Sequence, residues 1–209
     1  MTTAVSYNDS FDTTGLPNLL RGLTVLAVVQ AVCVLATSLV ERNLGGVANR
    51  GLTAVIVAFG ASFTIFYPGI RTRPRTIEGI AGAAAIGLGA TWAFMVLDLA
   101  ILQPLHTYTN RWYQVGGGAN WWYIPAWWLV GTYLSWMGGF ILAHLGRKTG
   151  RPSLLTAIVL LAVLTAICGA GGAWLRFPGA GWNVPTFAIA IAPALLLENL
   201  LTWLAARRD

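Results

Sequence analysis

The stretch Leu154–Leu175, LLTAIVLLAVLTAICGAGGAWL, contains no charged residue and decides the fold class. A helix needs roughly 20 apolar residues to cross about 30 Å of hydrocarbon, and this stretch has that length. Five further stretches have the same character: Leu19–Val40, Leu52–Ile70, Ile77–Leu102, Ile124–Leu145 and Pro185–Ala205. Because only helices and closed barrels satisfy backbone polar groups in lipid, the sequence predicts an all-α, polytopic transmembrane bundle of six helices.

The composition favours a membrane protein over a water-soluble one. Of the 209 residues, 56% are hydrophobic and 10% are charged, whereas soluble domains carry about 25% charged residues. A single six-helix domain over residues 19–206 is expected, with a polar segment (1–18) before it and a basic end (207–209) after it. The net charge of +6 does not indicate nucleic-acid binding, because the basic residues lie at helix ends. Membrane lipids are therefore the expected partners.

The basic residues between the predicted helices are unequally shared between the two sides of the membrane. One side receives Arg21, Arg71, Arg73, Arg75, Arg147, Lys148, Arg151, Arg207 and Arg208. The other side receives only Arg42, Arg50, Arg111 and Arg176. By the positive-inside rule, this asymmetry predicts that both termini are cytoplasmic. We expect the membrane to be a bacterial inner membrane.

The chain contains 10 tryptophans, and most of them map to the non-cytoplasmic side. This aromatic layer comprises Trp112, Trp121, Trp122, Trp127, Trp128, Trp174 and Trp182. Part of it lies in the connector Gln103–Tyr123, whose first part is expected to form a short interfacial helix before the turn at Gly116–Gly118. Three interpretations stay open: an enlarged aromatic belt, a docking surface for another protein, or a site for a flat or isoprenoid ligand. Quinone, carotenoid, chlorophyll and lipid are the candidate ligands.

Two acidic residues inside the predicted helices are candidate functional residues, because a carboxylate in lipid is costly unless it is paired or protonated. Asp98 lies about one turn from the non-cytoplasmic end of its helix, where Arg111 or Arg176 could form an ion pair with it. Glu198 lies deeper, and together with Asn199 and the helix-interrupting Pro193 it forms a polar kink in an apolar helix. Either acid is a candidate catalytic residue, but their different depths predict that they do not share a site.

Small residues recur at every fourth position in three of the predicted helices. The stripes are Gly79, Ala83, Gly87, Thr91; Gly131, Ser135, Gly139, Ala143; and Thr165, Gly169, Ala173. Such stripes let helix backbones approach closely in lipid. They predict either contacts within the bundle or contacts with another membrane subunit.

Motifs that would indicate catalysis or metal binding are missing from the sequence. The two cysteines, Cys33 and Cys168, form no CxxC motif or Cys/His cluster, so no metal site is expected. No serine-hydrolase, prenyltransferase, zinc-protease or nucleotide-binding motif occurs. The sequence therefore favours a non-catalytic subunit of a larger membrane complex, for example an energy-transducing or photosynthetic assembly.

Two alternatives remain. The segment AWLRF at Ala173–Phe177, with the late Glu198, resembles small membrane-bound terpene cyclases, although the Trp-Glu signature of those enzymes is missing here. The resemblance implies an enzyme that acts on a lipid or isoprenoid, with Glu198 or Asp98 as general acid. The second alternative is a small proton- or cation-coupled transporter that uses Glu198 and the break at Pro193.

Overall fold

The computed structural model describes residues 13–108, 123–149 and 153–207. They form α1 (Leu16–Asn43), α2 (Gly46–Thr72), α3 (Ile77–Leu97), η1 (Asp98–Leu102), α5 (Tyr123–Thr149), α6 (Leu154–Trp174) and α7 (Val184–Arg207). The described part of the chain contains no strand. Six helical segments are long and apolar enough to cross a membrane, the third being α3 continued by η1. The predicted all-α membrane fold is confirmed.

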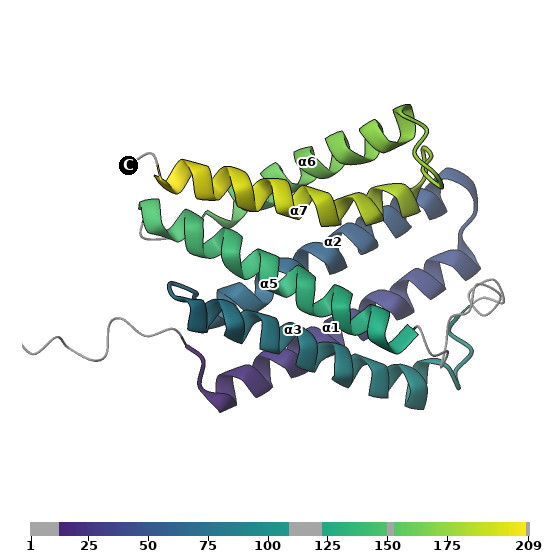
Figure 1. Cartoon of the computed structure of the whole chain (residues 1–209). Coiled ribbons are helices and arrows are strands. Elements are labelled where there is room, and N and C mark those ends of the chain that lie inside the picture. The colour runs from purple at the N-terminus through teal and green to yellow at the C-terminus, as the bar shows by residue number, and fades with distance from the viewer. Residues whose placement is uncertain (1–12, 109–122, 150–152, 208–209) are drawn as a thin grey trace, which may run out of the picture.

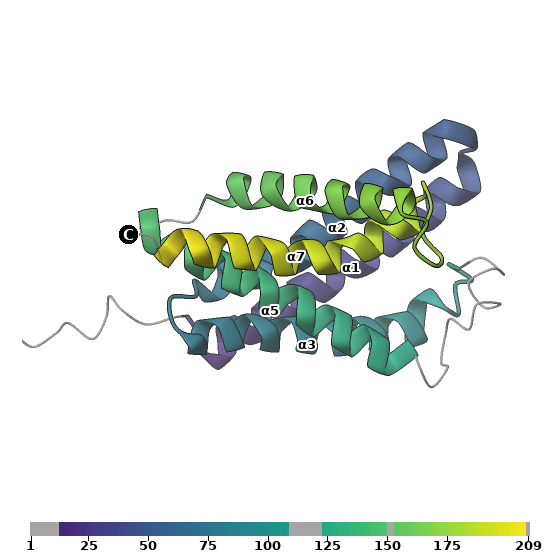
Figure 2. The same ribbon diagram turned by 45° about the horizontal axis from the view of Figure 1, so that its top comes forward.

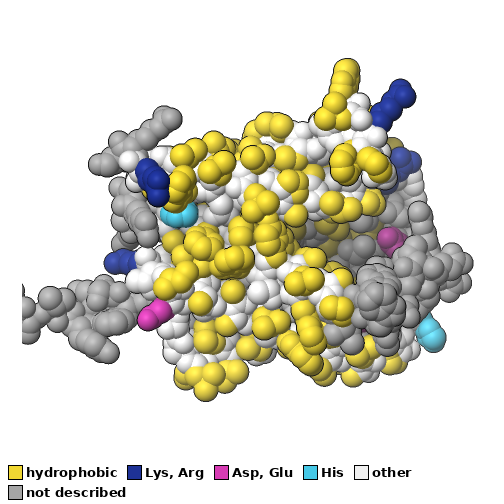
Figure 3. Space-filling model, viewed as in Figure 1, with side chains coloured by type: hydrophobic (Ala, Val, Ile, Leu, Met, Phe, Trp, Pro, Cys, Tyr) yellow, Lys and Arg dark blue, Asp and Glu magenta, His cyan; other side chains and the backbone are white. Residues whose placement is uncertain are grey.

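The helices run back and forth between two ends of the molecule (Figures 1 and 2). Leu16 and Arg207 lie at one end, which we call the terminal end. The α1–α2 turn, η1 and the α6–α7 connector lie at the opposite end, the loop end (Figure 1). Hydrophobic side chains cover the face between the two ends, and charged side chains gather at the ends (Figure 3). An apolar band between two charged rims is the surface that a bilayer requires.

The helix α5 lies at the centre of the packing. It packs most extensively on α3, and it also contacts α2 and α7. The helices α1, α2, α3 and α5 form a four-helix bundle, to which the α6–α7 hairpin attaches mainly through α7. One apolar cluster, including Leu26, Ile86 and Phe94, joins α1 and α3. A second, including Phe66 and Ile141, joins α2, α5, α6 and α7.

The small-residue stripes of α3 and α5 face each other. A Cβ atom on Gly87 would lie 2.6 Å from the carbonyl oxygen of Gly131, and one on Gly139 would lie 3.1 Å from the Cβ atom of Ala83. In α6, a Cβ atom on Gly169 would lie 2.5 Å from the ring of Phe187 on α7. These stripes therefore serve contacts within the bundle, which is the first of the two interpretations above.

Three features at the helix ends differ from the sequence-based expectations or extend them. The helix α1 begins at Leu16 rather than Leu19, and the amide of Thr13 donates to the carbonyl of Thr72 at 3.0 Å. The helix α2 begins at Gly46, well before the apolar stretch, because a helix can continue into the polar interface. The expected interfacial helix lies outside the described residues except for Gln103–Tyr108, which forms turns.

Candidate functional site

Asp98 lies at the loop end, where α3 widens into the π-helix η1. The amide of Gln103 donates to the carbonyl of Asp98 at 2.9 Å, the five-residue spacing of a π-turn. The buried Asp98 carboxylate accepts hydrogen bonds from Gln103 Nε2, at 2.7 Å, and from the Tyr108 hydroxyl group. Ser38 of α1 donates to the carbonyl of Thr107 at 2.5 Å. Asp98 thus holds the segment that follows η1 in place beside α1.

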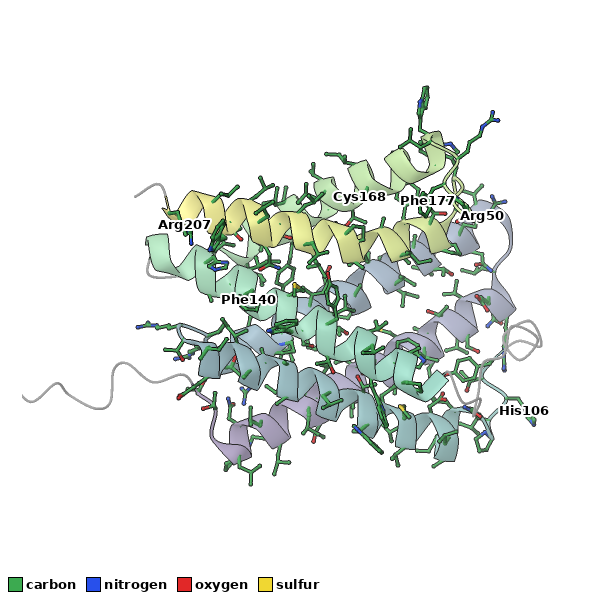
Figure 4. All side chains as sticks on the ribbon, viewed as in Figure 1. Arg50, His106, Phe140, Cys168, Phe177 and Arg207 are labelled. Carbon is green, nitrogen blue, oxygen red and sulfur yellow. The ribbon has the colours of Figure 1, made fainter. Side chains whose placement is uncertain are left out.

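The predicted ion pair of Asp98 with Arg176 does not form. Arg176 is exposed in the α6–α7 connector, and Figure 4 shows its neighbour Phe177 on the opposite side of the loop end from His106, which follows η1. Hydrogen bonds from residues close in sequence serve the Asp98 carboxylate instead. The other predicted partner, Arg111, lies outside the described residues.

Glu198 lies on the buried stripe of α7, which packs on α5 and α6. Its side chain has no exposed surface, and neither carboxylate oxygen has a hydrogen-bond partner in the structure. The neighbouring polar side chains bind backbone instead: Thr202 donates to the Glu198 carbonyl at 2.8 Å, and Asn199 donates to the carbonyl of Leu195 at 2.9 Å. No hydrogen bond within the structure therefore holds the Glu198 carboxyl group in place.

The residues of the predicted polar kink, Pro193, Glu198 and Asn199, differ in the contacts that they make. Pro193 lies inside α7, which continues through it, and Tyr133 of α5 donates to the adjacent carbonyl of Ala192 at 2.8 Å. Asn199 also reaches α5, where it donates to the carbonyl of Met137 at 3.3 Å. The Ala192 carbonyl next to Pro193 and the side chain of Asn199 therefore form hydrogen bonds between α7 and α5. The Glu198 carboxyl group makes no such bond.

Two tryptophans of the predicted aromatic layer are partly buried against α3. The ring of Trp128 stacks on that of Trp92 of α3, with 4.7 Å between centroids. The ring of Trp127 lies 6.0 Å from that of Phe94, also of α3. These residues join α5 to α3 near the loop end.

The aromatic surface that is open lies on the α6–α7 hairpin. The side chains of Trp174 and Trp182 are 81% and 71% exposed. The ring of Trp182 lies 6.2 Å from that of Phe187 at the start of α7. The three remaining members of the layer, Trp112, Trp121 and Trp122, lie outside the described residues.

A cavity of about 510 Å³ separates α2 from the α6–α7 hairpin at the loop end. We call it the groove. It is lined by Arg50, Ala54, Val57, Ala58, Thr165, Trp182, Asn183, Val184, Phe187, Ala188 and Ile191. Figure 4 shows Arg50 at the same end of the molecule as Phe177, opposite Arg207. The groove therefore opens near one rim of the apolar band.

The groove is polar at its mouth and apolar along its walls. The exposed Arg50 and the side chain of Asn183 lie at the mouth, whereas Val57 and Ile191 form part of the walls. Asn183 Oδ1 accepts a hydrogen bond from the amide of Thr186 at 3.0 Å, so Asn183 caps the start of α7. The positive end of this helix dipole adds to the charge of Arg50. This arrangement suits a ligand with a negatively charged head group and an apolar tail.

One polar atom inside the groove lacks a partner. The Thr165 hydroxyl group on α6 is buried and makes no hydrogen bond in the structure. In the sequence, Thr165 stands out only as a member of a small-residue stripe and Arg50 only as a topology determinant. Their proximity could not be seen in the sequence, because α2 and α6 are far apart along the chain.

Comparisons with protein-family models, with curated proteins and with solved structures found no match. Within the described residues, no group of three or more His, Cys, Asp or Glu side chains could hold a metal ion, and Cys33 and Cys168 are free thiols. The functional assignment therefore rests on the geometry of the helices.

Proposed function

We propose that this protein is a non-catalytic membrane component that binds an acidic phospholipid in the groove between α2 and the α6–α7 hairpin. The observation that carries the proposal is a single cationic side chain, Arg50, at the mouth of a cavity with mostly apolar walls. The cavity volume of about 510 Å³ lies within the range of ligand pockets. With its negative head group at Arg50, the lipid extends its acyl chains along the groove and into the adjoining bilayer.

Selectivity in this site rests on the head group. Because the bilayer is as apolar as the groove walls, an acyl chain gains little hydrophobic free energy on moving into the groove. An arginine guanidinium group, in contrast, forms paired hydrogen bonds with a phosphate group. The charge of Arg50 therefore favours an acidic lipid over the quinone, carotenoid and chlorophyll ligands that the sequence left open.

The Ala58→Phe variant should lose the bound lipid. Ala58 lines the groove, so a phenylalanine ring there occupies the space of the acyl chain. Lipid extraction and mass spectrometry of the purified protein should show less acidic phospholipid than in the wild type, as they should for Arg50→Gln, which removes the charge at the mouth of the groove. The matched control is Ala162→Phe, at an exposed alanine of α6 outside the groove. Wild-type lipid content in Ala58→Phe would contradict the proposal.

We also propose that the terminal end faces the cytoplasm of a bacterial inner membrane. The basic residues Arg71, Arg73, Arg75 and Arg207 lie at this end. The loop end carries fewer basic residues in the described part, chiefly Arg42, Arg50 and Arg176. This imbalance supports the orientation by the positive-inside rule.

Cysteine labelling in intact cells tests this orientation. In a chain whose Cys33 and Cys168 are replaced by serine, Phe177→Cys places a thiol at the loop end and Ile77→Cys places one at the terminal end; both native side chains are exposed. A membrane-impermeant maleimide should label the first thiol in intact cells and the second only after lysis. The reverse order of labelling would overturn the proposed orientation.

Packing against other membrane subunits stays a prediction. The exposed apolar residues of α6, namely Leu155, Val159, Val163 and Ile167, fit a partner helix and lipid equally well. Purification in a mild detergent should recover the protein with its partners, and with pigments if the assembly is photosynthetic. A monodisperse monomer without any co-purifying subunit or pigment would contradict this prediction.

An enzyme acting on a lipid or isoprenoid is the second candidate function. One observation favours it: the Glu198 carboxyl group is buried and has no hydrogen-bond partner, as a general acid in an apolar site would be. Asp98 fits this role less well, because Gln103 and Tyr108 hydrogen-bond to it. Lipid profiles that are unchanged both in cells carrying Glu198→Gln and in cells carrying Asp98→Asn would eliminate this candidate.

A further inference from the structure

We propose that the groove selects acidic phospholipids whose head group carries no amine, of the phosphatidylglycerol type, over phosphatidylserine. This selectivity rests on the proposed function, because it concerns the head group that binds at Arg50. Phosphatidylserine has the same net charge as phosphatidylglycerol, but its head group adds an ammonium group and a carboxylate. The mouth of the groove can therefore tell the two lipids apart only through its local chemistry.

The polar side chains at the mouth of the groove offer hydrogen-bond donors. The Arg50 guanidinium group and the Trp182 indole nitrogen can only donate. Asn183 Oδ1 already accepts hydrogen bonds from the amide and the hydroxyl group of Thr186, at 3.0 and 2.8 Å, which leaves the Nδ2 group of Asn183 as a donor. The mouth thus suits the acceptor oxygens of a phosphate group, and its side chains offer no acceptor to an ammonium group.

Thr165, the remaining polar residue of the groove, lies too deep to contact the head group. Its hydroxyl group can donate or accept a hydrogen bond. However, Thr165 lies nine residues before the end of α6 at Trp174, which corresponds to about 14 Å at 1.5 Å per residue. It therefore lies beside the acyl chains, whereas Arg50 and Asn183 meet the head group.

The charges around the groove are of one sign. None of its lining residues is acidic, and the sequence has no aspartate or glutamate at residues 42–77 or 99–197, which include all of them. The acids at the loop end within the described residues are Glu41, at the end of α1, and the buried Asp98; neither lines the groove. No acidic side chain of the groove therefore offsets the charge of Arg50, which repels an ammonium group.

Two further features favour an anion over a cation at the mouth. Asn183 caps the start of α7, where the helix dipole is positive. The exposed Arg176 adds a second positive charge to the connector that leads to Asn183. An aromatic ring such as that of Trp182 can attract an ammonium group, but it carries no net charge to offset the two arginines.

Native mass spectrometry tests the selectivity. The purified protein would be titrated with phosphatidylglycerol or with phosphatidylserine of the same acyl chains, and Arg50→Gln gives the background from lipids that coat the apolar surface. The wild-type protein should bind phosphatidylglycerol about two- to fivefold more tightly, which is the size of an exposed charge contact. Equal affinities above that background, or tighter binding of phosphatidylserine, would overturn the selectivity and leave the proposed function standing. Binding of both lipids only at the Arg50→Gln level would overturn both.

A pair of asparagines tests whether the mouth of the groove sets the preference. Asn183→Asp keeps an oxygen that caps α7 and gives an ammonium group a negatively charged acceptor, so it should abolish or reverse the preference for phosphatidylglycerol. Asn49→Asp is the matched control, because Asn49 precedes Arg50 in α2 but does not line the groove. This control has the same change of charge and should keep the wild-type preference. An equal loss of preference in both variants, or a loss in neither, would contradict selection at the mouth.

Discussion

The variant Gly138→Ala is expected to destabilise the protein by about 2–3 kcal/mol, although alanine is the better helix former. A Cβ atom at position 138 of α5 would lie 1.9 Å from the carbonyl oxygen of Ile65 and 2.9 Å from its Cγ2 atom. Because the closest atom belongs to the α2 backbone, no side-chain rotation can relieve the clash. The two helices must move apart, which loosens the cluster that contains Ile141 and Phe66.

The matched control for this variant is Gly171→Ala in α6. A Cβ atom on Gly171 would meet no other atom within 4 Å. Since helix propensity alone then acts, this substitution should be neutral or stabilising by up to about 1 kcal/mol. Unfolding of both variants in mixed micelles, followed by circular dichroism, gives the comparison. Equal stability of Gly138→Ala and the wild-type protein would contradict the close packing of α5 on α2.

The two buried acids are expected to respond to leucine substitution with opposite signs. Asp98→Leu removes the acceptor of Gln103 Nε2 and of the Tyr108 hydroxyl group, which should cost about 2–6 kcal/mol at about 1–3 kcal/mol for each orphaned group. Glu198→Leu removes a buried polar group without a hydrogen-bond partner, which should stabilise the protein by about 1–3 kcal/mol.

Unfolding in mixed micelles also measures the stability of Asp98→Leu and Glu198→Leu. Asp98→Asn is the control for the first substitution, because its carbonyl oxygen still accepts one hydrogen bond and the loss should be smaller. Glu198→Gln keeps the shape and polarity of the side chain, so its effect should lie between those of wild type and Glu198→Leu. A loss of stability in Glu198→Leu as large as that in Asp98→Leu would mean that Glu198 has a structural partner.

The helices could be predicted from the sequence because each apolar stretch has the length that a bilayer requires. The ends were less predictable: α2 extends to Gly46 through Asn49 and Arg50, which the hydrophobic pattern excluded. The π-helix η1 depends on bonds between residues five apart, such as Gln103 and Asp98, and apolar composition does not encode such spacing. In the sequence, the one sign of this irregular helix end was an acidic residue, Asp98, near the end of an apolar stretch.

The candidate sites were predictable only in part. The depth of Glu198 followed from its position in the last apolar stretch, but its lack of a partner depends on which faces α5 and α6 turn toward it. The groove brings Arg50 together with Thr165 and Asn183, which are distant along the chain. The small-residue stripes indicated close packing, yet only the structure shows that Gly87 meets Gly131 within one chain.

The lipid site between α2 and the α6–α7 hairpin is tested most directly by photolabelling. The protein would be reconstituted in vesicles that contain an acidic phospholipid with a photoreactive acyl chain, and the labelled residues would be identified by mass spectrometry. We predict that label concentrates on groove residues such as Val57, Phe187 and Ile191, and that Arg50→Gln disperses it. Label spread evenly over other lipid-facing residues, such as Leu129 and Val163, would contradict the proposed function.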